Sequence, residues 1–160
     1  MDSTIDEREI LARLERPFPA EAISWKPQSL YPREHPTRAL AVAYIDARDV
    51  AERLDEVLGL GWSFTWEADG ENVRGRLMMD LGGRLVVRED VGEPGEGDDG
   101  RSRKAAVSDA LKRCAVQFGV GRYLYRLPRV WVGYDEQKRQ LTEIPQLPEW
   151  ALPKEEAKPA

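Results

Sequence analysis

Cysteine and histidine are almost absent from this chain, and their scarcity removes several kinds of chemistry. Among 160 residues, Cys114 is the single cysteine and His35 the single histidine. One cysteine excludes an intrachain disulfide framework and a cysteine-based zinc site. One histidine leaves no pair of histidines for a metal site and disfavours a Ser-His-Asp triad. The sequence therefore points away from most metal-dependent and nucleophilic catalysis.

Long apolar runs are missing as well. No stretch approaches the roughly 20 apolar residues that a membrane span needs. Acids and arginines interrupt residues 1–16, so the chain does not open on a signal peptide. A glycine-rich loop followed by Lys-Ser or Lys-Thr is also absent, which gives no indication of ATP binding. We expect a protein of the cell interior with no cofactor, no membrane partner and no small-molecule substrate.

The charge of the chain is acidic overall but unevenly distributed. It holds 24 Lys and Arg against 29 Asp and Glu, a net charge of -5, which by itself disfavours nucleic-acid binding. Residues 101–129, however, contain eight bases and one acid, a net of +7. The rest of the chain therefore carries 16 bases and 28 acids, a net of -12. A basic segment in an otherwise acidic protein indicates an anionic partner on one face.

The hydrophobic pattern predicts an α+β layer in the order helix–β–β–β–helix. A short helix within residues 1–16 must end near Pro17, because proline disfavours helix at the residue before it. Residues 22–36 are punctuated by prolines and are expected to be irregular. The elements expected after them are a buried strand over 39–45, a helix from 46 to 58, a meander over 62–67, 73–80 and 84–91, a helix over 104–118 and a hairpin over 130–144. Residues 92–100 read as a mobile acidic loop.

The helix expected over 104–118 carries an uncompensated basic row. Lys104, Ser108 and Lys112 follow one another at intervals of four on the side opposite the apolar residues, and Arg113 flanks them. A solvated face is the ordinary explanation of such a row. Bases at a helix start are disfavoured by roughly 0.3–1 kcal/mol each, and the row lacks the acids at four-residue spacing that usually balance it. A phosphate backbone would supply the missing charge.

The meander adds two arginines and several aromatic residues to this pattern. Arg74 and Arg76 share one face of a strand, where they either cover the solvent side of the sheet or form a groove for single-stranded nucleic acid beside the basic helix. Core packing is the better interpretation of Trp62. Aromatic side chains that offer base-stacking surfaces are Trp25, Trp62, Trp66, Tyr123 and Tyr125.

An acidic cluster and Cys114 leave two alternatives to consider. The cluster, formed by Glu89, Asp90, Glu93, Glu96, Asp98 and Asp99, has the oxygen ligands of a Mg²⁺ site, as a metal-dependent nuclease would require. A solvated loop is the better interpretation, because the spacing fits no calcium-binding loop. Cys114 lies on the apolar helix face and is expected to be a buried structural thiol. A second alternative is an oligomeric scaffold that binds a protein through its basic face.

Two motifs resemble the signature of the Rad52-type single-strand annealing proteins. Arg88–Gly92 is similar to their characteristic strand end, and residues 104–119 fit the helix pattern A-x-[ST]-D-[AG]-L-K-R-x-x-x-x-F-G. The run from Tyr44 to Trp62 is similar to the first helix entering the meander. The resemblance covers residues 14–150, the expected core domain, with residues 1–13 as an N-terminal helix or arm. Residues 151–160 are expected to be a disordered tail, the start of a truncated C-terminal extension.

The resemblance implies a β-β-β-α core that assembles into a closed ring. Such proteins hold single-stranded DNA by its sugar-phosphate backbone and use no ATP. It implies a non-enzymatic protein that is associated with the nucleoid in the cytoplasm of a bacterium. Its expected role is to protect DNA ends and to anneal complementary DNA strands during double-strand break repair by homologous recombination. The family's Lys-Arg pair falls on Lys112 and Arg113. With the charge pattern, the expected DNA contacts are Lys112, Arg113, Lys104, Arg103, Arg101, Arg74, Arg76, Arg48 and Arg84.

Two departures from the family pattern lower the expected strength of DNA binding. Relatives carry a Lys-rich segment between the strand and the helix, where this chain has the acidic residues 92–100. Relatives also carry a further base three residues after the Lys-Arg pair, and here that residue is Val116. Both changes remove positive charge near the predicted groove.

Overall fold

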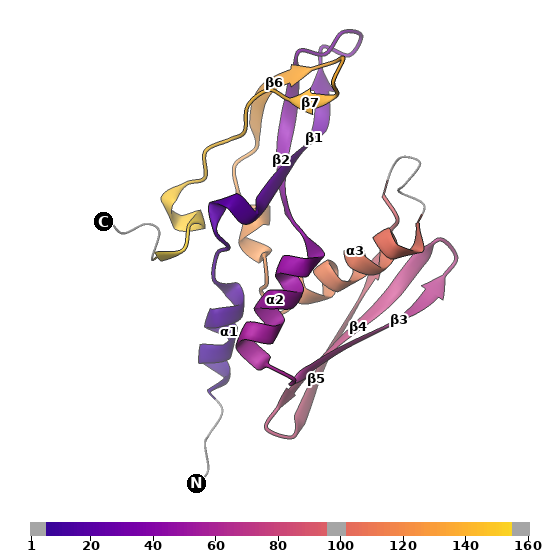
Figure 1. Cartoon of the computed structure of the whole chain (residues 1–160), viewed down its shortest axis with the longest axis vertical. Helices are drawn as coiled ribbons and strands as arrows, with labels where there is room; N and C mark the ends of the chain where they lie inside the picture. The colour runs from indigo at the N-terminus through magenta and orange to yellow at the C-terminus, as the bar shows by residue number, and fades with distance from the viewer. Residues whose placement is uncertain (1–5, 96–101, 155–160) are drawn as a thin grey trace. The chain divides into compact units, whose positions relative to one another are not determined.

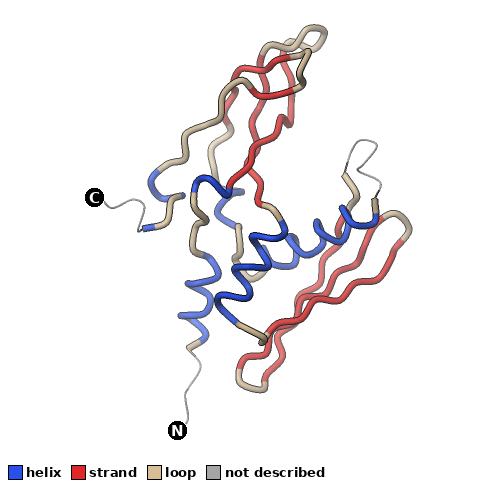
Figure 2. Tube along the Cα trace, in the orientation of Figure 1, coloured by secondary structure: helices blue, strands red, loops and turns tan. Residues whose placement is uncertain are grey.

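A computed structural model describes residues 6–95 and 102–154 (Figures 1 and 2). The chain divides into two compact units. Residues 1–16 and 47–122 form one, called here the three-stranded unit. Residues 17–46 and 123–160 form the other, called the four-stranded unit. Each unit is built around its own antiparallel sheet.

The three-stranded unit contains the predicted meander and its helices. Its elements are α1 (Glu7–Glu15), α2 (Ala47–Leu58), β3 (Trp62–Asp69), β4 (Asn72–Leu81), β5 (Arg84–Gly92) and α3 (Arg103–Val116). The strands pair antiparallel in the order β3-β4-β5, and α3 lies across one face of the sheet (Figure 1). The α+β class and the order of these elements are confirmed. The observed bounds lie within two residues of the expected ones for most elements, because strong hydrophobic periodicity defines them.

Small residues let α3 approach this sheet closely. A Cβ built on Gly75 would lie 2.9 Å from the Phe64 ring and 3.0 Å from the Cβ of Ala110. A Cβ on Gly92 would overlap the carbonyl oxygen of Ala106 and the backbone nitrogen of Ala110. Ala106 and Ala110 are themselves fully buried. The backbone of α3 therefore rests almost directly on β4 and β5.

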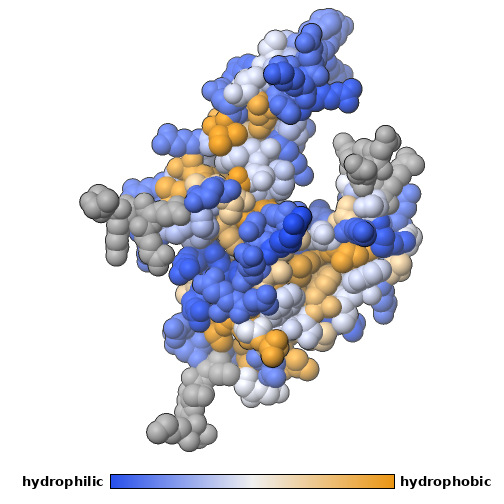
Figure 3. Space-filling view, viewed as in Figure 1, coloured by the Kyte–Doolittle hydropathy of each residue, from blue (hydrophilic) through white to orange (hydrophobic). Residues whose placement is uncertain are grey.

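This close approach changes which residues form the centre of the buried helix face. The sequence pattern assigns Val107 and Leu111 to that face, but both are only half-buried. Ala106, Ala110 and Cys114 lie at its centre with no exposed area. The periodicity identifies the correct side of the helix, but the two glycines of the sheet admit only small residues opposite them. Apolar side chains nevertheless gather over α3 and the adjoining sheet in Figure 3.

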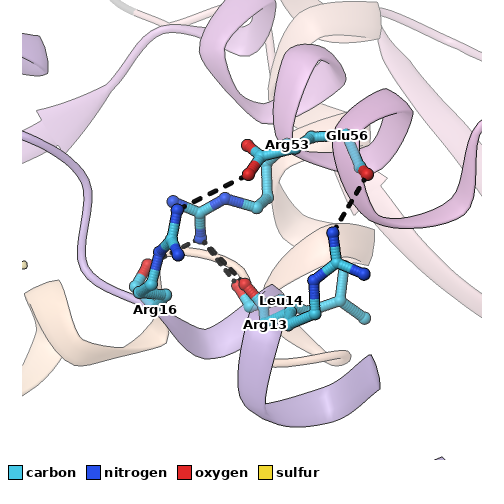
Figure 4. Close-up of polar contacts among 5 residues, drawn as sticks. All are labelled: Arg13, Leu14, Arg16, Arg53 and Glu56. Atoms are coloured by element: carbon cyan, nitrogen blue, oxygen red, sulfur yellow. Dashed lines mark hydrogen bonds and ion pairs between the residues drawn. The ribbon is translucent and has the colours of Figure 1, made fainter. Parts of the chain in front are cut away.

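A buried arginine joins α1 to α2 (Figure 4). Arg53 of α2 is only 5% exposed. Its Nη1 donates to the carbonyl oxygens of Arg13 at 3.4 Å, Leu14 at 3.1 Å and Arg16 at 2.6 Å. These carbonyls lie at the C-terminal end of α1, where no intrahelical donor is available. A cation is also favoured at this end of a helix, so Arg53 caps α1 and fixes it to α2.

The four-stranded unit corrects one sequence expectation. It contains β1 (Ile23–Tyr31), β2 (Arg38–Ile45), β6 (Val130–Asp135) and β7 (Gln140–Leu141), antiparallel in the order β1-β2-β6-β7. The expectation that residues 22–36 are irregular is wrong, because β1 runs through Pro27. That proline is tolerated because β1 is an edge strand, and the register shifts between Pro27 and Ser29. The predicted hairpin within 130–144 is confirmed by the pairing of β6 with β7.

Short 3-10 helices complete the described chain, at Ala20–Ala22, Arg122–Arg126 and Glu149–Ala151. Ala151 and Pro153 are buried. The rest of the expected disordered tail, residues 155–160, lies outside the described residues, as do residues 96–101 of the acidic loop and its flank. The core boundaries at residues 14 and 150 stay a prediction. No helix formed by the described residues is long and apolar enough to cross a membrane.

Cys114 is expected to be chemically inert in the folded protein. It has no exposed area, and burial, followed by the negative charge of Asp90, raises its pKa from 9.0 to about 11. At pH 8 only about one thiol in a thousand would be ionised. Ellman's reagent should therefore release almost no thionitrobenzoate from native protein and one equivalent in guanidinium chloride. Rapid labelling of the native chain would contradict the packing described for α3.

Candidate nucleic-acid interface

The exposed side of α3 carries the basic row predicted from the sequence. Ser102 begins the helix, its hydroxyl accepting the backbone N–H of Ala105 at 3.1 Å. No acid occupies the first turn. Because the opposite side rests on the sheet, Lys104 and Ser108 are exposed and Lys112 is half-buried. The row is thus presented by a helix whose rotation is fixed by close packing.

Arg113 is held by an acid one turn earlier. Its Nε donates to Oδ2 of Asp109 at 2.9 Å, and 47% of its side chain remains exposed. The same Asp109 oxygen accepts the backbone N–H of Glu93 at 2.9 Å. Asp109 therefore orients the guanidinium and also ties the chain after β5 to the helix. The single acid of the basic segment is fully engaged in this arrangement.

The other predicted contacts are spread over the three-stranded unit. Nη1 of Arg103 donates to the carbonyl oxygen of Asn72 at 3.0 Å, which ties the start of α3 to the turn between β3 and β4. Arg48 is exposed in the first turn of α2. Arg84, at the start of β5, forms an ion pair with Glu7 of α1. Arg101 lies outside the described residues.

The groove expected between the meander arginines and α3 is wrong. Arg74 and Arg76 are exposed on β4, whereas their alternating neighbours Val73 and Leu77 are buried beneath α3. Side chains two residues apart share a face and adjacent ones do not, so the arginines point away from the helix. Arg76 also pairs with Glu89, Nη2 to Oε1 at 2.6 Å. A DNA contact by either arginine stays a prediction, but on a separate surface.

Two of the acids considered as metal ligands, Glu89 and Asp90, have side-chain partners within the protein. Glu89 pairs with Arg76, and Oδ2 of Asp90 accepts Nε2 of Gln117 at 3.1 Å. The backbone N–H of Glu93 is held by Asp109. In the part of the chain that the structure describes, no group of three or more His, Cys, Asp or Glu is placed to hold a metal ion. Glu96, Asp98 and Asp99 lie outside that part.

The aromatic residues predicted as stacking surfaces divide into two groups. Nε1 of Trp62 donates to Asp55 at 2.8 Å, and the hydroxyl of Tyr123 accepts the backbone N–H of Phe18 at 2.9 Å. These contacts give both rings structural roles. Trp25 is half-buried. Trp66 is 45% and Tyr125 75% exposed, so these two rings remain accessible.

Sequence reasoning missed a basic and aromatic surface on the four-stranded unit. Nζ of Lys26, on β1, lies 5.4 Å from the centre of the Tyr44 ring, on β2. Tyr44 is 38% exposed. The sequence pattern predicts a buried strand over residues 39–45, and this prediction hides the accessible face. The signal that would have revealed it is that Arg38 and Tyr44 lie an even number of residues apart at the two ends of this strand, so they share one face.

Comparison with known proteins identifies the family to which this chain is similar. Residues 6–142 match the family described as "Rad52/22 family double-strand break repair protein". The chain is 50% identical over 155 residues to "Single-stranded DNA-binding protein DdrA" of Deinococcus deserti, covering 94% of this chain and 74% of the relative. It is 48% identical to the protein of the same name from Deinococcus radiodurans, covering 94% and 71%. No solved structure matches the chain.

Segments outside the helix motif point to a finer assignment within the family. Three of them had indicated DdrA of radiation-resistant bacteria within the family: the opening Arg16–Pro27, the stretch Gly121–Pro128 and the end Leu147–Trp150. That resemblance is confirmed by the two relatives. The match over residues 6–142 spans both units of the fold. The chain therefore belongs to the Rad52/22 family of double-strand break repair proteins.

Proposed function

We propose that this chain is a non-enzymatic single-stranded DNA-binding protein that protects DNA ends and anneals complementary strands during double-strand break repair. It acts without ATP, in the bacterial cytoplasm, on DNA of the nucleoid. Residues 14–150 constitute the functional core. Membership of the Rad52/22 family and the name shared by both relatives support this assignment.

The observation that carries the proposal is the basic side of α3. Lys104, Lys112 and Arg113 project from a helix whose other side is closed against a sheet, and Asp109 holds Arg113 in place. Cations presented along one side of a single packed helix suit a phosphate backbone, which carries negative charge in every sequence. Such contacts give affinity without reading bases, which annealing requires because the bases must stay free to pair.

Assembly into a ring of identical chains is part of the proposal. The face of the three-stranded sheet that points away from α3 exposes apolar residues, among them Leu85 at 65%, Val87 at 39% and Val91 at 39%. Exposed apolar surface of this kind is typical of an interface between protein chains. A closed ring would also align one α3 per subunit into a continuous basic track, although the chain as a whole is acidic.

The proposal is tested by fluorescence anisotropy with a labelled single-stranded oligonucleotide at two salt concentrations, beside a duplex of equal length. We expect tight, salt-sensitive binding that favours the single strand, because phosphate contacts release counterions. No binding at low salt would overturn the proposal and favour an oligomeric scaffold that binds protein. Loss of label after addition of Mg²⁺ would instead indicate a nuclease.

A further inference from the structure

Two aromatic rings form an exposed pair at one end of the four-stranded sheet. Tyr31, the last residue of β1, is 63% exposed, and Trp131 on β6 is 42% exposed. Their ring centres lie 6.5 Å apart and their planes meet at 74°. Leu40 of β2, directly opposite Trp131 in the sheet register, is only 7% exposed. The rings therefore shield the sheet on one side and offer their outer surfaces to solvent.

A cation shares this face with the two rings. Arg38 is the register partner of Tyr31 on one side and of Gly133 on the other. Directly opposed residues of antiparallel strands project from the same face, so the exposed Arg38 side chain rises beside Tyr31. Gly133, opposite Arg38, contributes no side chain, and the side chains of Thr142 and Glu143 occupy the space where its Cβ would lie. On the same face of the sheet, Lys26 stands over Tyr44 further along the strands.

Three of the acids near this end of the sheet contact other groups of the protein. Oδ1 of Asp135 accepts the backbone N–H groups of Gln137 at 2.9 Å and Lys138 at 3.0 Å. Oε1 of Glu143 accepts the N–H of Gly133 at 3.1 Å. Oε2 of Glu136 lies 3.6 Å from Nδ1 of His35. The strand positions of this face therefore include the cations Arg38 and Lys26 beside the aromatic rings, and its one strand carboxylate among the described residues, Asp135 at the end of β6, is held by two backbone donors.

Accessible aromatic rings beside a cation match the chemistry of an unpaired nucleotide. A nucleobase presents a flat π surface that stacks on tyrosine or tryptophan whatever its identity, while the adjoining phosphate requires a cation. A base within a duplex is already stacked on its neighbours and does not offer that surface. A single apolar or aromatic peptide side chain would cover the rings but would leave Arg38 without an anion, whereas a nucleotide carries its own phosphate.

We propose that Tyr31 and Trp131 form a stacking site for one unpaired nucleobase of single-stranded DNA, with Arg38 meeting the adjoining phosphate. This inference rests on the proposed DNA-binding function and deepens it. The site differs from the basic row of α3, because it holds a base rather than the backbone alone. It therefore makes binding depend on the presence of bases as well as on charge.

The test compares two oligonucleotides with the same number of phosphates, one of thymidines and one with abasic residues throughout. Wild-type protein should bind the thymidine strand more tightly, by roughly five- to tenfold. Tyr31→Ala and Trp131→Ala should each reduce this preference, whereas Tyr31→Phe and Trp131→Phe should retain it. Trp150→Ala, which removes a ring that is 52% exposed elsewhere in the unit, is the matched control. None of these variants should change the salt dependence, because no charge is altered.

Each outcome decides a different point. If the alanine variants keep the wild-type preference, the stacking site is wrong and the proposed function stands. If the wild type binds neither strand, the proposed function itself fails. Should Trp131→Ala unfold by uncovering Leu40, the unaltered chain is cross-linked by light to an oligonucleotide containing iododeoxyuridine. Mass spectrometry should then find the cross-link on Tyr31 or Trp131, and its absence from both would overturn the inference.

Discussion

Replacing Lys112 and Arg113 together by alanine is expected to abolish most of the affinity for single-stranded DNA. The two side chains lie next to each other on α3, so they would contact neighbouring phosphates of one strand. Loss of two contacts should reduce the slope of log affinity against log salt by about 1.4 per bound protomer. Affinity near 0.1 M salt should fall at least roughly tenfold for all sequences alike. Anisotropy titrations at several salt concentrations measure both quantities.

The matched control removes the same number of charges elsewhere. Lys138 and Arg139 form an adjacent basic pair in the turn between β6 and β7, where both are exposed. Arg139 has a φ of 55°, so asparagine is the suitable replacement there, combined with Lys138→Ala. This control should weaken DNA binding far less than the α3 variant does, although its turn lies at the end of the sheet that carries the proposed stacking site. If the two double variants are equally weakened, net charge rather than the α3 site governs binding. If the α3 variant matches wild type in affinity and slope, that site is wrong.

Among substitutions that keep the length of the side chain, Arg53→Met should cause the largest loss of stability. The variant leaves the carbonyl oxygens of Arg13, Leu14 and Arg16 without their shared donor in a buried place. Leaving buried acceptors unsatisfied costs about 1–3 kcal/mol for a group, so about 3 kcal/mol is expected for the variant. That corresponds to a decrease in Tm of about 10 °C for a chain of this size. Thermal unfolding followed by circular dichroism gives the result.

An exposed arginine at the same helix junction serves as the comparison. Arg16 lies 3.5 Å from Glu56, and both side chains are about half exposed. Surface ion pairs contribute less than about 1 kcal/mol, so Arg16→Ala should change the Tm only slightly. The variant keeps the backbone carbonyl of residue 16, which accepts a hydrogen bond from Arg53. A similar loss in both variants would show that Arg53 does not act through the buried end of α1.

The fold could be predicted where one pattern dominates the sequence. The alternation of Val73, Gly75, Leu77 and Met79 defines β4 and its buried face, and the structure confirms both. The pattern fails in β1, where Pro27 suggests a loop. Only the register with β2 shows that this proline sits on an edge strand beside a bulge. Such long-range pairing leaves no trace in a local window of sequence.

The charge pattern of the sequence predicts which residues form the basic row of the candidate site, but it does not predict how the surrounding elements pack. The basic row is visible from spacing alone, because α3 is long and one of its sides is apolar. Spacing does not show that α3 covers the opposite side of β4 from Arg74 and Arg76. It also does not show that Tyr31 and Trp131, 100 residues apart in the chain, meet across a sheet. Both facts depend on tertiary packing.

The glycine and alanine contact between α3 and its sheet has a consequence for how this protein can evolve. A side chain on Gly75 would meet the Phe64 ring and Ala110, and one on Gly92 would meet the backbone of α3, while Ala106 and Ala110 have no exposed area. Lys104 and Arg113, on the other side of the same helix, face solvent and do not share that constraint. Selection can therefore alter the charge and reach of the outer face without disturbing the inner one. A library randomised at all six positions should recover stably folded clones with varied outer residues and nearly invariant inner ones.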